Sequence, residues 1–188
     1  TFFLRILRGS SIQGLTGIPA QRHHIVRPLI DAGRSDIMTF LHQHNLLFRI
    51  DRTNLESDTD RNFIRNRVFP VLCERFPDFR GPLTRTMEMI RDEDAYIGQQ
   101  ADELFRESVV KAADGLDLNL DMLRNHSAVL QARVILLALY RIFGPNTRWS
   151  RSHVRSILKL ADSRHPSKAL HMPGRLMVTR EEDRLKFS

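Results

Sequence analysis

The chain has 188 residues, of which 41% are hydrophobic and 27% charged, enough for a sizeable core in one compact domain or two small ones. No apolar run approaches the roughly 18 residues of a membrane span, no signal peptide is recognisable, and the single cysteine excludes a disulfide framework, so we expect a cytoplasmic protein. The net charge of +7, carried mostly by arginine, favours a polyanion such as RNA, because guanidinium groups bind phosphates and stack on bases.

The first predicted elements alternate between helix and strand. Residues 2–7 have apolar side chains at helical spacing, and Gly9 offers this helix a natural stop. We expect a short strand over 24–30, a helix capped by Ser35, and a second strand over 46–50 that ends at Asp51. This is the order of a parallel sheet, which binds ligands beyond the carboxyl ends of its strands, so Asp51 lies where a ligand is expected.

Residues 51–70 change in charge along their length. Acids crowd the first half, and the second half holds arginines and amides, namely Arg61, Asn62, Arg65, Asn66 and Arg67. A helix is predicted to begin near Asp58, and Pro70 is expected to end or kink it, because proline lacks an amide proton. Surface ion pairs such as Asp58 with Arg61 explain part of the pattern, but they leave Asp51, Asn54 and Asn62 unexplained.

The second half of the chain is predicted to be mainly helical. A segment rich in proline and glycine, residues 75–83, is the best domain boundary in the sequence. After it we expect a long helix over 83–104, a helix capped by Ser127 and closed by Gly144, a helix capped by Ser150, and a terminal hairpin with strands near 175–180 and 184–187.

Other candidate sites are weaker. The neighbouring histidines at 23 and 24, and at 42 and 44, lack the i, i+4 spacing of zinc ligands, which disfavours a metal site. Cys73, beside apolar neighbours, is typical of a buried structural thiol. Arg8 followed by Gly9 places a cation next to flexible backbone, which suits a phosphate, although a simple glycine helix stop explains the same pair.

Four segments resemble, in order and spacing, the motifs of the bacterial tRNA(Ile)-lysidine synthetases. They are Leu7-Arg8-Gly9-Ser10, Arg27-Pro28-Leu29, Asp51-x-Thr53-Asn54, and Arg61-Asn62-x-Ile64-Arg65 closing at Pro70. The resemblance covers nearly the whole chain, and the motifs around Asp51 and Arg61 are its most specific part. Ser11 replaces a glycine of the family pattern. The family's ATP-pyrophosphatase loop, Ser-Gly-Gly-x-Asp-Ser, is expected upstream of Thr1, so we expect a fragment that is inactive alone.

The resemblance implies a mainly α (α+β) fold. Residues 1–77 are expected to be the C-terminal part of a Rossmann-like α/β ATP-pyrophosphatase domain, and residues 78–188 a helical tRNA-binding domain that ends in a β-hairpin. The implied reaction is ATP-dependent ligation of lysine to the wobble cytidine of the CAU anticodon of isoleucine tRNA, through an adenylated intermediate. ATP with magnesium is the expected cofactor, this tRNA and free L-lysine are the expected partners, and a homodimer is left open.

The resemblance also implies roles for single residues. The expected catalytic pair is Asp51 and Asn54, the expected nucleotide contacts are Arg8 and Gly9, and the expected tRNA-binding residues are Arg61, Asn62, Arg65 and Arg67. Asp51 would receive the lysine, while Asn54 and Asn62 would hold their loop or contact the cytosine. Two alternatives remain open. One is a related tRNA-modifying enzyme of the same loop superfamily, disfavoured in its multi-cysteine form by the single Cys73, and the other is a non-catalytic helical RNA-binding module.

Overall fold

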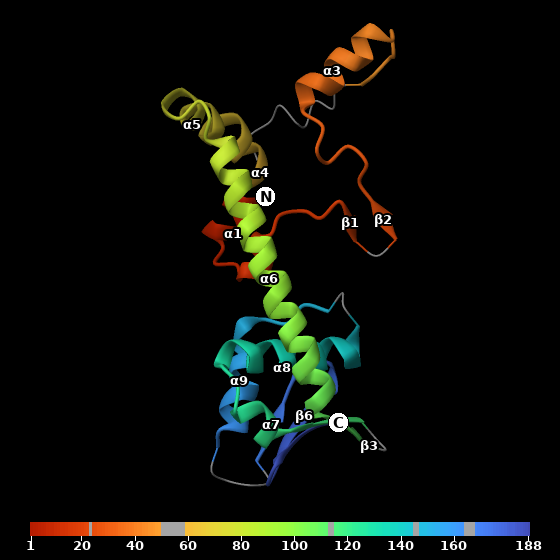
Figure 1. Cartoon of the computed structure of the whole chain (residues 1–188), viewed down its shortest axis with the longest axis vertical. Helices are drawn as coiled ribbons and strands as arrows, with labels where there is room; N and C mark the ends of the chain where they lie inside the picture. Colours follow the sequence, from red (N-terminus) through yellow and green to blue (C-terminus); the bar gives the residue numbers. More distant parts are fainter. Residues whose placement is uncertain (23, 50–58, 113–114, 145–146, 164–167) are drawn as a thin grey trace. The chain divides into compact units, whose positions relative to one another are not determined.

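The computed structural model describes residues 1–22, 24–49, 59–112, 115–144, 147–163 and 168–188. The chain divides into two compact units, Thr1–Asp94 and Ala95–Ser188, which are described separately (Figure 1). Helices predominate and each unit also holds β-structure, so the mainly helical α+β class is confirmed. The predicted domain boundary after residue 77 remains a prediction. Among the described helices, none is both long and apolar enough to cross a membrane.

The first unit is built mainly from short elements. In chain order they are α1 (Phe2–Leu7), α2 (Ile12–Leu15), β1 (Gln21–Arg22), β2 (Ile25–Val26), α3 (Arg34–Gln43), α4 (Asp60–Phe63), the π-helix η2 (Ile64–Val68), α5 (Phe69–Arg75) and the first part of α6 (Arg80–Ser108). Of the described large apolar side chains in this unit, only that of Ile64 is buried. An apolar surface of this extent is typical of a region that packs against a partner or another part of a protein.

Two helices of the first unit begin and end for local reasons. The predicted α1 is confirmed, and Gly9, just beyond its last turn, has a φ of 70°, a left-handed conformation that glycine adopts without strain. The prediction that Ser35 caps α3 is wrong, because the N-cap is Gly33, whose carbonyl accepts the first helical bond from the Ile37 amide at 3.0 Å. The Ser35 hydroxyl lies instead 3.4 Å from the Asp36 carboxylate.

The predicted parallel sheet is not present in the described part of the first unit. The strand expected over 24–30 is reduced to β2, which pairs antiparallel with β1. The Arg27 amide still donates to the Ala20 carbonyl in the register of this pairing, but Pro28 has no amide proton to continue the ladder. Residues 46–49, predicted as a strand, form none, and Leu47 is fully exposed. Asp51 lies outside the described residues.

Residues 60–75 form three consecutive helical elements. Thr59 caps α4, where its hydroxyl accepts a hydrogen bond of 3.2 Å from the Asn62 amide. The wider turn of η2 follows, and Pro70 falls in the first turn of α5. A regular α-helical hydrogen bond at this point would need an amide proton that Pro70 lacks, and the proline ring would clash with the preceding turn. The wider π-turn relieves both problems. Pro70 does not end the helical run as predicted, because the run continues through α5 to Arg75, and the run begins at Asp60.

The second unit combines helices with one antiparallel sheet. Its elements are the second part of α6, β3 (Val109–Ala112), β4 (Gly115–Asn119), α7 (Leu120–Arg124), α8 (Ala128–Phe143), α9 (Arg151–Ala161), β5 (Ala169–His171), the 3-10 helix η3 (Pro173–Arg175), β6 (Met177–Glu181) and β7 (Arg184–Phe187). The five strands lie in the order β3-β4-β7-β6-β5. The predicted terminal hairpin is confirmed as β6 and β7, with Glu181 opposite Arg184.

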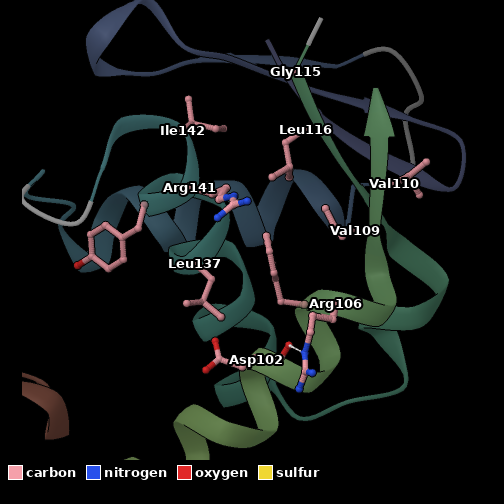
Figure 2. Close-up of a pocket in the computed structure, with 11 residues that line it drawn as sticks. Asp102, Arg106, Val109, Val110, Gly115, Leu116, Leu137, Arg141 and Ile142 are labelled. Carbon is pink, nitrogen blue, oxygen red and sulfur yellow. Dashed lines mark hydrogen bonds between the residues drawn. The ribbon is translucent and has the colours of Figure 1, made fainter. Parts of the chain in front are cut away.

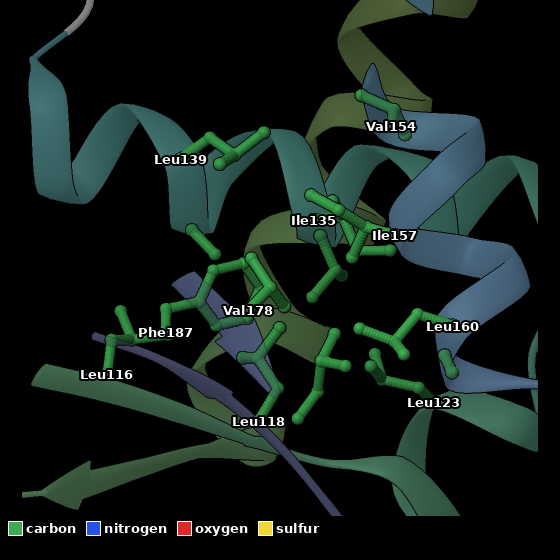
Figure 3. Packing of buried hydrophobic residues seen from close by; sticks show 14 of the residues in the cluster. Leu116, Leu118, Leu123, Ile135, Leu139, Val154, Ile157, Leu160, Val178 and Phe187 are labelled. Carbon is green, nitrogen blue, oxygen red and sulfur yellow. The ribbon is translucent and has the colours of Figure 1, made fainter. Parts of the chain in front are cut away.

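The core of the second unit lies between the sheet and the helices α8 and α9 (Figure 3). Leu118, Val178 and Phe187 project from the strands toward Ile135 and Ile157 of these helices, and all five are at most 1% exposed. Complete burial of such side chains contributes roughly 1.5–3 kcal/mol each, so this cluster is the main source of stability in the unit.

Short-range signals place the helices of the second unit correctly. The Ser127 hydroxyl accepts a bond of 3.4 Å from the Leu130 amide at the start of α8, and Gly144 closes that helix with a φ of 83°. At the start of α9, Ser150 and His153 satisfy each other's backbone amides in a capping box. The predicted caps and the long helix α6 are therefore confirmed.

Candidate functional site

The end of α1 and the start of α4 meet through one ion pair. Arg8 is the C-cap residue of α1, and its Nη2 lies 2.5 Å from Oδ2 of Asp60, the first residue of α4. The two residues are 52 positions apart in sequence, and their side chains are 67% and 68% exposed. The fold therefore brings the predicted nucleotide contact, Arg8, to the segment that carries the predicted tRNA-binding residues.

A small apolar cavity lies next to this ion pair. Its volume is about 310 Å³, and α1, α4 and η2 line it with Phe3, Leu4, Leu7, Arg8, Asp60, Phe63, Ile64 and Val68. Arg8 and Asp60 are its only charged lining residues among those described. Such a site presents an apolar wall beside an exposed guanidinium, a combination that suits a flat apolar group linked to an anion.

The predicted tRNA-binding arginines are exposed. Arg61, Arg65 and Arg67 all lie on the surface, and none forms an ion pair with a carboxylate of the described residues. Nη2 of Arg61 is 3.5 Å from the Thr1 hydroxyl.

The other predicted site residues fall into two groups. Asn62 is buried at 9% exposure, which favours the reading in which its amide holds the surrounding loop over direct contact with a base. Gly9 has open space around the position that a Cβ would take, so a ligand can approach its backbone closely. Asp51 and Asn54, the predicted catalytic pair, lie outside the described residues, and their roles stay predictions.

A second basic surface lies on α9 and was not among the predicted site residues. Val154, Ile157, Leu160 and Ala161 are buried on one face of this helix, while Arg151, Arg155 and Lys159 are exposed on the other. We call these three cations the α9 stripe. Their i, i+4 spacing was the signal available in the sequence. None of the three forms an ion pair with a described carboxylate.

A further cavity lies within the second unit, between the ends of α6 and α8 and the hairpin β3–β4 (Figure 2). It has a volume of about 990 Å³. Its walls include Val109, Leu116 and Leu137, and Arg106 and Arg141 project at its edge (Figure 2). Nε of Arg106 donates to the Asp102 carbonyl at 3.2 Å.

No group of three histidine, cysteine or carboxylate side chains suited to a metal ion is found among the residues that the structure describes. Cys73, predicted as a buried structural thiol, is half-buried and reduced.

Comparison with known proteins places these features in a family context. Residues 1–72 match the model of the PP-loop domain. The match includes the meeting point of Arg8 and Asp60, and the buried Asn62.

The chain is also similar to curated proteins along its length. It is 31% identical to the tRNA(Ile)-lysidine synthase of Clostridioides difficile over 97% of this chain and 40% of that protein. It is 32% identical to the tRNA(Ile)-lysidine synthase of Symbiobacterium thermophilum over 100% of this chain and 41% of that protein. A bifunctional protein TilS/HprT of Listeria monocytogenes is 25% identical over 100% of this chain and 30% of its own length.

These matches confirm the resemblance to tRNA(Ile)-lysidine synthetases that the sequence motifs indicated. The chain spans about two fifths of the length of the first two relatives. The PP-loop match covers the motifs at Arg8, Asp51 and Arg61, whereas the similarity to the synthases continues through the second unit.

Proposed function

We propose that the complete gene product ligates lysine to the wobble cytidine of the CAU anticodon of isoleucine tRNA, with ATP as the energy source. The observation that carries this proposal is the similarity to tRNA(Ile)-lysidine synthases along the whole chain, together with a PP-loop domain over residues 1–72. In this proposal residues 1–77 form the nucleotide-binding domain, which also contributes Arg61, Arg65 and Arg67 to the tRNA, and residues 78–188 form the tRNA-binding domain.

The proposed chemistry has two steps. The carbonyl oxygen at position 2 of the cytidine attacks the α-phosphorus of ATP, and pyrophosphate leaves. The amine of lysine then attacks carbon 2, the bond from that carbon to the adenylate oxygen breaks, and AMP leaves. Negative charge develops on phosphate oxygens in both steps, so the protein gains most by placing fixed N–H donors beside them.

Arg8 and Gly9 fit the nucleotide. The guanidinium of Arg8 is two-thirds exposed, and the backbone of Gly9 is open to close approach. The neighbouring apolar cavity of about 310 Å³ can receive part of a flat ring system. We assign the phosphates to Arg8 and the Gly9 backbone, and a magnesium ion would share their charge.

Asp51 and Asn54 are assigned to the lysine. A carboxylate can bind the ammonium group of the amino acid and orient its attacking amine, which converts a bimolecular encounter into an oriented reaction. Asn54, three positions later, has an amide suited to holding this loop by hydrogen bonds to its backbone.

The tRNA is assigned to two groups of exposed cations, one in each unit. Arg61, Arg65 and Arg67 would bind phosphates near the anticodon, while buried Asn62 supports their helix. The α9 stripe would bind phosphates elsewhere on the tRNA. A wobble base must leave its stack to react, and RNA is recognised most readily in such unpaired loops.

The deciding experiment measures incorporation of labelled lysine into isoleucine tRNA with a CAU anticodon by the complete gene product. We expect incorporation that requires ATP and is lost when the wobble cytidine is replaced by uridine. Binding of the tRNA without any ATP-dependent incorporation would instead support the non-catalytic RNA-binding module.

A further inference from the structure

Asp60 is not a residue of the predicted site, yet it makes the closest contact to Arg8. Its Oδ2 is 2.5 Å from Nη2 of Arg8, a short charge-assisted contact that joins two helices of the first unit. Thr59, immediately before it, caps α4: its hydroxyl accepts a hydrogen bond from the backbone amide of Asn62. This cap fixes the backbone from which the Asp60 carboxylate projects. The partner of Arg8 is thus anchored by its own helix start.

The contact engages only one edge of the guanidinium. Arginine offers five N–H donors in a planar fork, and the described residues provide no other hydrogen-bond acceptor for the Arg8 side chain. The Arg8 side chain is 67% exposed, so its remaining donors are open to solvent, and open space surrounds the position that a Cβ would take at the next residue, Gly9. One edge of Arg8 is therefore held while the other is free to receive an anion.

We propose that Asp60 is a positioning residue, which holds the Arg8 guanidinium in one orientation so that its free N–H donors, together with the Gly9 backbone, bind the phosphates of the nucleotide. This inference rests on the proposed function, because it takes ATP as the anion. A free arginine side chain loses rotamer entropy when it binds phosphate, and a partner that orders it beforehand removes part of that cost.

The negative charge of Asp60 also repels the phosphates of ATP, which opposes the gain from ordering Arg8. Whether removal of Asp60 weakens or strengthens ATP binding therefore decides between the two effects. If Asp60 mainly competed with ATP for Arg8, its removal would strengthen ATP binding. If it orders Arg8, its removal weakens ATP binding. Because the pair is largely exposed, we expect a modest effect, about 2- to 5-fold in the ATP dissociation constant.

The test uses the complete gene product and ATP as the probe, with binding measured by isothermal titration calorimetry. We expect Asp60→Asn to raise the dissociation constant about 2- to 5-fold and to raise the KM for ATP in the same ratio, with kcat at saturating ATP nearly unchanged. Asp60→Glu should restore part of the affinity, because it keeps the carboxylate.

A double-mutant cycle shows whether Asp60 acts through Arg8. In an Arg8→Ala background, Asp60→Asn should cause no further loss. The matched control is Asp121→Asn, which removes the carboxylate of another exposed arginine pair, 3.3 Å from Arg124, and should leave ATP binding unchanged.

Two outcomes overturn the inference in different ways. Unchanged or tighter ATP binding by Asp60→Asn, while Arg8→Ala weakens it, would refute the role of Asp60 and leave the proposed function intact. Unchanged ATP binding by Arg8→Ala would refute both the assignment of Arg8 to the phosphates and the dependent role of Asp60. Lysine incorporation by the unmodified protein tests the proposed function separately.

Discussion

The exposed arginines after α4 make a quantitative prediction about tRNA binding. Arg61, Arg65 and Arg67 are on the surface and make no ion pair with the described carboxylates, so each is available to one phosphate. Each such contact steepens the dependence of log affinity on log salt by about 0.7–0.9. Replacing all three by alanine should therefore lower the slope by about 2–3, and Arg65→Ala alone by about one.

The slope translates into a measurable change in affinity. Between 50 and 200 mM salt, the affinity of the unmodified protein should fall by roughly 20- to 40-fold more than that of the triple variant, since three contacts of about 0.7–0.9 each act on a four-fold change in salt. Filter binding of the CAU isoleucine tRNA over a salt series measures this directly. Arg184→Ala, which removes an exposed arginine 3.9 Å from Asp183, is the control. An unchanged slope in the triple variant would show that these arginines do not bind phosphates.

Three further predictions concern the reaction, the second unit and its core. Asp51→Asn in the complete gene product should abolish lysine incorporation and largely spare tRNA affinity, and equal losses in both assays would contradict its assignment to lysine. Replacing the α9 stripe by alanine should weaken tRNA binding in low salt and leave ATP binding unchanged, and unaltered tRNA affinity would remove α9 from the interface. Ile157→Ala should reduce the free energy of unfolding by about 2–5 kcal/mol in urea, because Ile157 is fully buried, whereas Val129→Ala, at 55% exposure, should change it by less than about 1 kcal/mol.

The helices of the second unit were predictable because their signals are local. Ser127, Gly144 and Ser150 each act within four residues of the helix end that they define. The terminal hairpin was predictable for the same reason, since β6 and β7 are joined by a tight turn. Each of these signals is contained in a stretch shorter than one helix.

The sheet as a whole was not predictable from such signals. β4 pairs with β7, which lies far along the chain, and nothing in residues 115–119 identifies that partner. In the first unit a strand was predicted where none forms. The apolar residues 46–48 have the composition of a strand but have no strand to pair with among the described residues. Strand formation depends on a partner, and composition does not supply one.

The candidate site shows the same division between local and distant signals. The motif residues Arg8 and Arg61 were identified from sequence, but the acid that holds Arg8 was not, because Asp60 lies 52 positions away. Sequence spacing suggested Asp58 as the partner of Arg61, and Asp58 lies outside the described residues. Only the structure shows that Asp60 is the carboxylate that pairs with Arg8.

The change from acids to arginines along residues 51–70 acquires a physical meaning from this pairing. Asp60, at the positive end of the α4 dipole, is satisfied by an arginine of the same unit, so its negative charge does not repel an approaching polyanion strongly. Arg61, Arg65 and Arg67 follow with no described carboxylate to neutralise them. Within residues 60–67, the one acid is thus paired inside the protein and the arginines are left for a ligand, which is the charge arrangement that a phosphate-binding surface requires.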